Sequence, residues 1–146
     1  MDLAQVCANV FELYEPLAEA KPVAFTLDAP APLPVRGDFE LLVEAIANLV
    51  DNAIKFTPEG GAVTVAATTL GDWPAVRVTD TGPGIPGGER NHIFERFYRS
   101  SKTRHIPGSG LGLSMVAAIA DLHGFDLRVE DNRPGAVFEI SPRQAN

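Results

Sequence analysis

The stretch that decides the fold runs Glu44-Ala45-Ile46-Ala47-Asn48-Leu49-Val50-Asp51-Asn52-Ala53-Ile54-Lys55-Phe56. At about 100° per residue, a helix through this stretch places apolar side chains on one face and polar side chains on the opposite face. The apolar face carries Leu42, Ile46, Leu49 and Ala53. The polar face carries Glu44, Asn48, Asn52 and Lys55. We therefore predict a long helix that packs one face on a core and turns the other toward solvent or a ligand.

The polar face of this helix allows two interpretations. Most such faces are simply solvated. Asparagine is a poor helix former, however, and exposed helix positions are usually filled by Glu, Lys or Gln. Amide oxygens such as those of Asn48 and Asn52 can ligate Mg²⁺, and the ammonium of Lys55 can meet phosphate oxygens. The face is either solvated or one wall of a metal and polyphosphate site, and the other walls of such a site have to come from elsewhere in the chain.

The segments around this helix predict a two-layer α/β sandwich (α+β). Asp38 is a suitable N-cap for the long helix, and Thr57-Pro58-Glu59-Gly60-Gly61 ends it. Further helices are expected at residues 2–20 and 111–122, with at most a short one at 93–97. Strands are expected at residues 23–27, 62–69, 75–79, 125–130 and 135–140. This order favours a mixed, mostly antiparallel sheet with helices on one face and the other face open.

Length, composition and charge limit the function classes. The chain has 146 residues, a formal net charge of −7 and a single cysteine, which indicates one domain over residues 1–146 in a reducing, intracellular setting. No signal peptide or membrane span is evident. An acidic chain is a poor candidate for binding nucleic acid or an anionic membrane. Residues 89–105 nevertheless form a basic island, with Arg90, Arg96, Arg99, Lys102 and Arg104.

A glycine-rich segment, Asp80-Thr81-Gly82-Pro83-Gly84-Ile85, follows a predicted strand. It fits the dinucleotide-binding fingerprint only superficially, because prolines interrupt it and no helix clearly begins at Gly87. A carboxylate at this strand end can accept a hydrogen bond from the exocyclic amine of adenine. Guanine has a carbonyl at that position, which could not donate such a bond. The alternative is that Asp80 caps the turn before Gly82, and the sequence leaves both interpretations open.

A second glycine-rich segment, Gly108-Ser109-Gly110-Leu111-Gly112-Leu113, opens the predicted helix at residues 111–122. Its glycines leave backbone N–H groups accessible at a helix N-terminus, where the partial positive charge favours phosphate. The Walker sequence of P-loop NTPases is missing. Phosphate would therefore be bound in another way.

Taken together, these segments resemble the catalytic ATP-binding domain of sensor histidine kinases, in the superfamily of DNA gyrase B, Hsp90 and MutL (the HATPase_c or GHKL group). The N box matches at residues 44–56, the G1 box at 80–85, the F box at 93–99 and the G2 box at 108–113. The resemblance covers residues 2–140 and implies a Bergerat ATP-binding fold with an ATP lid at about residues 86–109. ATP and Mg²⁺ are the implied cofactors.

The resemblance also implies roles for individual residues. Asn48 would ligate Mg²⁺, Asn52 and Lys55 would line the triphosphate, and Asp80 would bind the adenine amine. The catalytic candidates are Glu44, Asn48 and Lys55; for Glu44, a base or polariser and a solvated side chain are equal alternatives. The expected nucleotide-binding residues are Asn48, Asn52, Lys55, Asp80, Gly82, Gly84, Ile85, Arg99, Gly108, Ser109, Gly110, Leu111, Gly112 and Leu113.

The implied partners lie outside this chain. None of His92, His105 and His123 has the context of a phosphoacceptor, so we expect a separate dimerisation domain to carry the acceptor histidine and a response regulator to follow it. We expect a cytoplasmic location, including the cytoplasmic part of a membrane-bound receptor. The alternatives are a stand-alone anti-sigma-type serine kinase, disfavoured by the F box, and a non-catalytic nucleotide-binding scaffold, disfavoured by the intact N and G1 boxes.

Overall fold

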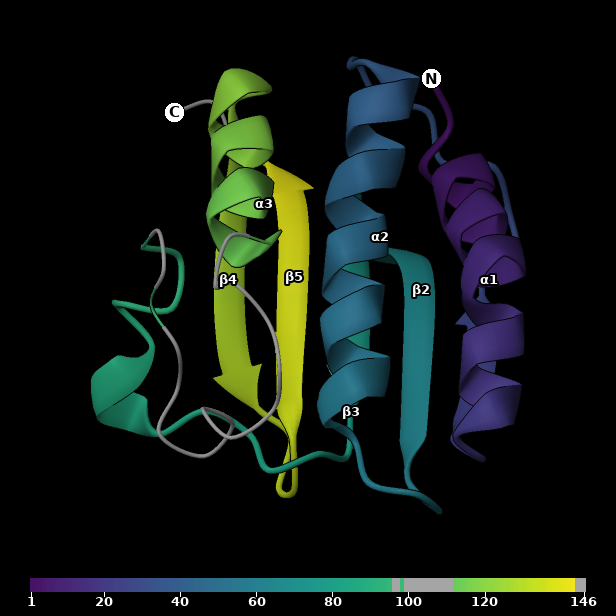
Figure 1. Cartoon of the computed structure of the whole chain (residues 1–146). Helices are drawn as coiled ribbons and strands as arrows, with labels where there is room; N and C mark the ends of the chain where they lie inside the picture. The colour runs from purple at the N-terminus through teal and green to yellow at the C-terminus, as the bar shows by residue number, and fades with distance from the viewer. Residues whose placement is uncertain (96–97, 99–111, 144–146) are drawn as a thin grey trace.

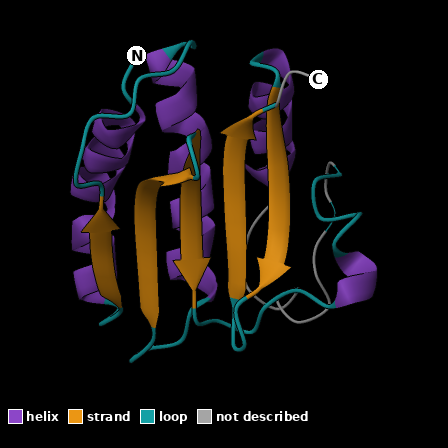
Figure 2. Cartoon of the chain, turned by 180° about the vertical axis from the view of Figure 1, so that it is seen from behind, coloured by secondary structure: helices purple, strands orange, loops and turns teal. Residues whose placement is uncertain are grey.

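Three helices cover one face of a five-stranded sheet in the computed structural model of the chain, which describes residues 1–95, 98 and 112–143 (Figures 1 and 2). The helices are α1 (Leu3–Ala20), α2 (Phe39–Phe56) and α3 (Gly112–Leu122). Figure 2 shows the opposite face of the sheet without any helix over it. The predicted two-layer sandwich is confirmed.

The sheet is mixed, and its strands follow the order β1-β2-β3-β5-β4. The strands are β1 (Ala24–Asp28), β2 (Ala62–Leu70), β3 (Trp73–Asp80), β4 (Phe125–Asp131) and β5 (Ala136–Pro142). Strands β1 and β2 are parallel because α2 returns the chain between them, and the other neighbours are antiparallel. In this order β3 and β5 pair at the centre of the sheet, so Asp80 at the end of β3 lies beside the start of β5.

The long helix α2 begins and ends where its sequence predicts. The side chain of Asp38 accepts a hydrogen bond from the backbone N–H of Leu41 at 3.0 Å, as an N-cap residue does. The apolar face of α2 is buried against the sheet through Leu42, Ile46, Leu49 and Ala53. On the other side of this core, the strands contribute Val63, Val65, Val78, Phe138 and Ile140. The apolar half of the predicted wheel is therefore confirmed.

In its described part, the segment after β3 is irregular and contains a short 3₁₀ helix at Gly87–Glu89 that the sequence did not indicate. The sequence allowed at most one short helix at residues 93–97, and in the described part of this range, Ile93–Glu95, the chain makes turns. Hydrophobic contacts explain this course: Ile93 is buried, and the ring of Phe94 packs edge-on against Phe138 of β5 with centroids 6.2 Å apart. Burying Ile93 and packing Phe94 beside it constrain the backbone more than its weak helix propensity does.

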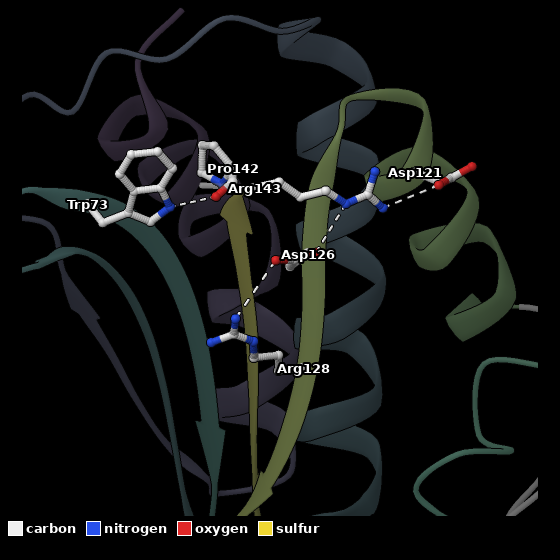
Figure 3. A network of polar contacts seen from close by, with 6 residues as sticks. All are labelled: Trp73, Asp121, Asp126, Arg128, Pro142 and Arg143. Atoms are coloured by element: carbon white, nitrogen blue, oxygen red, sulfur yellow. Dashed lines mark hydrogen bonds and ion pairs between the residues drawn. The ribbon is translucent and has the colours of Figure 1, made fainter. Parts of the chain in front are cut away.

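The open face of the sheet carries paired charges (Figure 3). The guanidinium of Arg143 lies 3.1 Å from Asp126 and 3.3 Å from Asp121, and the guanidinium of Arg128 lies 3.8 Å from Asp126. The indole N–H of Trp73 donates to the carbonyl of Pro142. These contacts tie β3, β4, β5 and the end of α3 together. Among the described helices, none combines the length and the apolar composition that a membrane crossing requires.

Candidate nucleotide-binding site

The polar face of α2 forms the first wall of the candidate site. Glu44 is exposed, whereas Asn48, Asn52 and Lys55 are half-buried. The amide nitrogen of Asn48 donates to the carbonyl of Glu44 at 3.0 Å and lies 3.7 Å from the sulfur of Met115 in α3. With its nitrogen engaged in this way, Asn48 is oriented by contacts from its own helix and from α3. A side chain that only faces solvent would not need a fixed orientation.

The start of α3 packs directly against the two asparagines. A Cβ on Gly112 would lie 3.4 Å from the side-chain oxygen of Asn48 and 3.9 Å from the side-chain nitrogen of Asn52. These are ordinary van der Waals distances, so the first turn of α3 lies in contact with both amides. Gly112 of the G2 segment and the two asparagines of the N box therefore lie side by side in the structure. Leu113 next to it and Ile85 after β3 are partly buried against the core.

Asp80 forms the second wall, at the end of β3. Its side chain is 9% exposed, and its Oδ1 accepts hydrogen bonds from the backbone N–H groups of Gly82 at 2.8 Å and Ala136 at 3.2 Å. None of the residues in the described part of the chain donates to the other carboxylate oxygen, Oδ2. The turn-capping role considered for Asp80 is thus confirmed for one oxygen, while the second oxygen is left as an acceptor.

Burial raises the pKa of Asp80, and the two backbone hydrogen bonds from Gly82 and Ala136 counteract part of that rise. The cause is desolvation, which disfavours the ionised form. A buried carboxylate held by main-chain donors is costly to the fold and is therefore more typical of a binding site than of a scaffold.

The turn between β4 and β5 contacts the backbone of Asp80, and the sequence did not predict this contact. The side-chain amide of Asn132 donates to the backbone carbonyl of Asp80 at 2.7 Å. Gly135, at φ +102°, lies so close that any Cβ there would collide with the same carbonyl. Gly84, at φ +73°, packs against the carbonyl of Gly135. The run Asn132-Arg133-Pro134-Gly135 signals a turn, but nothing in it signals that the turn supports Asp80.

The two walls meet at the C-terminal end of α2. A Cβ on Gly82 would lie 3.2 Å from the carbonyl oxygen of Phe56 and 3.2 Å from Oδ1 of Asp80. From Asn48 to Phe56 the helix rises by about 12 Å, at about 1.5 Å per residue. The site therefore has an amide-rich end facing α3 and a carboxylate end facing β3. The predicted residues Arg99, Gly108, Ser109, Gly110 and Leu111, and most of the basic island, lie outside the described residues.

The amide-rich end of the site suits a metal ion whose ligands are mainly phosphate oxygens. The described residues contain no cluster of three or more His, Cys, Asp or Glu side chains that could hold a metal ion alone. One amide oxygen beside a polyphosphate is nonetheless a suitable donor set for Mg²⁺, which usually keeps several waters and relies on substrate phosphates. Asn48 thus fits an Mg²⁺ ion that arrives with a nucleotide.

The C-terminal end of α2 is held by Lys21, which follows α1. Its ammonium donates to the carbonyls of Ile54, at 2.8 Å, and of Lys55. A cation here satisfies orphan carbonyls and interacts favourably with the helix dipole. Lys21 thereby fixes the turn of α2 that carries Lys55.

Replacing Lys21 by methionine is expected to lower the free energy of unfolding by about 1–2 kcal/mol, because two helix-end carbonyls lose a charged donor. Methionine keeps an unbranched apolar stem, so the packing changes little. Urea unfolding followed by circular dichroism measures the loss. Arg36→Met, at an exposed position, is the matched control and should stay within about 0.5 kcal/mol of the wild type. Equal stability of the two variants would contradict the role of Lys21.

Comparisons with known proteins agree with the fold. A signal transduction histidine-protein kinase/phosphatase, MprB of Mycobacterium sp. (strain KMS), is 51% identical over 102 residues, which cover 69% of this chain and 20% of that protein. The adaptive-response sensory kinase SasA of Synechocystis is 41% identical over 143 residues, covering 95% of this chain and 37% of that protein. The chain therefore spans a fifth of the length of the one relative and less than two fifths of the other.

Solved structures show the same architecture. The mycobacterial sensor histidine kinase MprB superposes with a TM-score of 0.84 and 34% identity, over 99% of each chain. The catalytic domain of the histidine kinase ThkA superposes with a TM-score of 0.84 and 28% identity, over 96% of this chain and 92% of that one. The expected Bergerat fold is confirmed by these superpositions. Residues 37–146 also match a family model, and the chain belongs to the histidine kinase-, DNA gyrase B-, and HSP90-like ATPase family.

Proposed function

We propose that this domain binds Mg-ATP and donates the γ-phosphate to a histidine on a partner dimerisation domain, as part of a two-component sensor histidine kinase. The observation that carries the proposal is the position of α2, which presents Asn48 and Asn52 to the first turn of α3 and ends against the Asp80 segment. Three sequence segments that are far apart in the chain thereby converge on one helix. The printed names of MprB and SasA as kinases support the same conclusion.

Each wall of the site has a separate task in this proposal. Oδ2 of Asp80 accepts a hydrogen bond from the adenine amine, and the carbonyl of guanine would offer no donor there. Asn52 and Lys55 contact the triphosphate, and Asn48 holds Mg²⁺ together with the phosphates. Bound Mg²⁺ would neutralise phosphate charge during transfer. The segment glycines Gly82, Gly84 and Gly112 let the backbone approach the nucleotide, with Ile85 and Leu113 beside them.

The protein residues contribute positioning and charge stabilisation in this mechanism, rather than a covalent intermediate. Glu44 lies exposed one turn before Asn48, where it can face an incoming acceptor, and its role as a base stays a prediction. The roles of Arg99 in the lid and of residues 108–111 in the G2 box also stay predictions. The partners that we infer are the dimerisation domain of the same kinase and a response regulator. The proposed location is the cytoplasm, including the cytoplasmic side of a membrane-bound receptor.

A phosphotransfer assay tests this proposal. The domain is mixed with γ-labelled ATP, Mg²⁺ and a helical hairpin that carries the acceptor histidine, with the His→Gln hairpin as control. We expect label only on the histidine hairpin, in a bond that is lost in acid and survives base. Acid-stable label would favour the serine kinase alternative, and ATP binding without transfer would favour the scaffold. Absence of ATP binding would overturn the proposal itself.

A further inference from the structure

The side chain of Met115 in α3 lies beside the amide-rich end of the site. Met115 follows Gly112 by one helical turn, so both residues lie on the face of α3 that turns toward the asparagines of α2. The sulfur of Met115 lies 3.7 Å from the amide nitrogen of Asn48, and 42% of the residue is exposed. The thioether is therefore accessible to small reagents and also in contact with the residue that we assign to Mg²⁺.

The nitrogen and the oxygen of the Asn48 amide have separate surroundings. The nitrogen, which carries two hydrogens, donates to the carbonyl of Glu44 at 3.0 Å and to the sulfur of Met115. The oxygen accepts no hydrogen bond from the part of the chain that the structure describes, and it is the atom that we assign to Mg²⁺. Because a thioether is a weak acceptor, a stronger acceptor at Met115 would change the orientation of the amide.

The other two sulfur atoms of the chain are less suited to oxidation. The chain has one cysteine and two methionines. Cys7 is fully buried, and desolvation, together with the negative charge of Asp2, raises the pKa of its thiol to about 12. Only the thiolate is reactive, so Cys7 is protected. Met1 is partly buried against the core, and a Cβ on Gly37 would lie 3.0 Å from its methyl carbon. We therefore expect a peroxide to react first with Met115.

We propose that Met115 is a site of reversible oxidation by peroxide, and that its sulfoxide weakens the binding of Mg-ATP at the amide-rich end of the site. The inference rests on the proposed function, because it concerns the Mg²⁺ that arrives with ATP. A lone pair of the thioether sulfur attacks one oxygen of hydrogen peroxide, the O–O bond breaks and an S–O bond forms. The sulfur loses two electrons, and the peroxide is reduced to water. Methionine sulfoxide reductases reverse the change.

The sulfoxide acts on the metal through Asn48. Oxidation converts an apolar side chain into a polar one, and the new oxygen is a stronger hydrogen-bond acceptor than the sulfur. It draws the amide nitrogen of Asn48 away from the carbonyl of Glu44, and the amide oxygen turns away from the metal position. Changing a residue that orients a metal ligand typically costs about ten- to a hundredfold in metal affinity. We expect the lower end of this range, because the methionine side chain is flexible.

Calorimetry before and after treatment with hydrogen peroxide tests the inference, with the sulfoxide located by peptide mass spectrometry. We expect Met115 to be oxidised before Met1, the affinity for Mg-ATP to fall about tenfold, and methionine sulfoxide reductases to restore it. The affinity for ATP in EDTA should not change, because Asn48 acts through Mg²⁺. Met115→Leu keeps the volume without an oxidisable sulfur, so peroxide should leave its affinity, whatever the starting value, unchanged. Met1→Leu is the matched control and should respond as the wild type does.

Several results would overturn the inference. One is an unchanged affinity for Mg-ATP when Met115 is fully oxidised, and another is oxidation of Met1 in preference to Met115. An equal loss of affinity with and without Mg²⁺, or the same loss in Met115→Leu, would also overturn it, because general damage would then explain the effect. If the untreated protein bound no Mg-ATP, the proposed function would fail instead, and the two failures are thus distinguishable.

Discussion

Asp80→Asn is expected to weaken ATP binding by about ten- to a hundredfold while leaving the domain at least as stable at pH 7. Oδ2 of Asp80 is the acceptor for the adenine amine in the proposed complex, and an amide nitrogen in its place would meet that amine as a second donor. The asparagine oxygen can still accept from Gly82 and Ala136, so the turn is retained. Calorimetry with Mg-ATP and thermal unfolding of the same samples measure the two effects.

The stability part of this prediction has a defined pH dependence. Burial raises the pKa of Asp80 above its ordinary value of 3.8, so between that value and the raised one the folded state binds more protons than the unfolded state. The stability contributed by Asp80 therefore falls as pH rises through this window, and above it the wild type carries the full cost of a buried charge. The asparagine variant carries no such cost. Its advantage in melting temperature should grow as pH rises from below 3.8 to neutrality.

Asp28→Asn is the matched control for Asp80. Asp28 also ends a strand, β1, but it is exposed and lies at the edge of the sheet. Its substitution should change neither ATP affinity nor the pH dependence of stability. If Asp80→Asn bound ATP as tightly as the wild type, Asp80 would not be the adenine contact.

Asn48→Ala is expected to abolish Mg²⁺-dependent phosphotransfer to a histidine hairpin, with a loss of at least about a hundredfold in rate, as for removal of one preorganised transition-state contact. Alanine removes the one amide oxygen that we assign to Mg²⁺. It also favours the helix, so unfolding should not explain the loss. The measurement is the rate of label transfer at saturating ATP, over a range of Mg²⁺ concentrations.

Asn9→Ala on α1 serves as the control for Asn48, because it makes the same substitution in another helix, where the side chain of Asn9 accepts a hydrogen bond from Gln5 of the same helix. It should leave phosphotransfer unchanged. Transfer by Asn48→Ala at the wild-type rate, with the same dependence on Mg²⁺, would remove Asn48 from the site.

Local sequence patterns were sufficient to predict most of the fold. The helix period and the Asp38 cap located α2, and the alternating strands on either side of Gly71 located the β2–β3 hairpin. The segment at residues 93–97, where the sequence allowed at most one short helix, makes turns in its described part, and packing of Ile93 and Phe94 decides the course of the backbone there. Tertiary contacts of this kind leave no local pattern.

The site was predictable only where its residues lie in motifs. Asn48, Asn52 and Asp80 were predicted in this way, and Gly112 lies close to the two asparagines in the structure. Asn132 was not predicted. Its side chain donates to the backbone carbonyl of Asp80 from 52 positions away in the sequence. Such residues become visible when the chain is folded, because their partners are defined by distance in space.

Because α2 connects both ends of the site, insertions and deletions within this helix are restricted. One residue inserted between Asn48 and Phe56 would turn the rest of the helix by about 100° and lengthen it by about 1.5 Å. Either the asparagines would leave α3 or the helix end would leave Asp80. The β2–β3 turn has no such restriction, since no atom lies within 4 Å of the Cβ that Gly71 lacks. Insertions and deletions can therefore accumulate at Gly71 in evolution, whereas the spacing within α2 has to be kept to the residue.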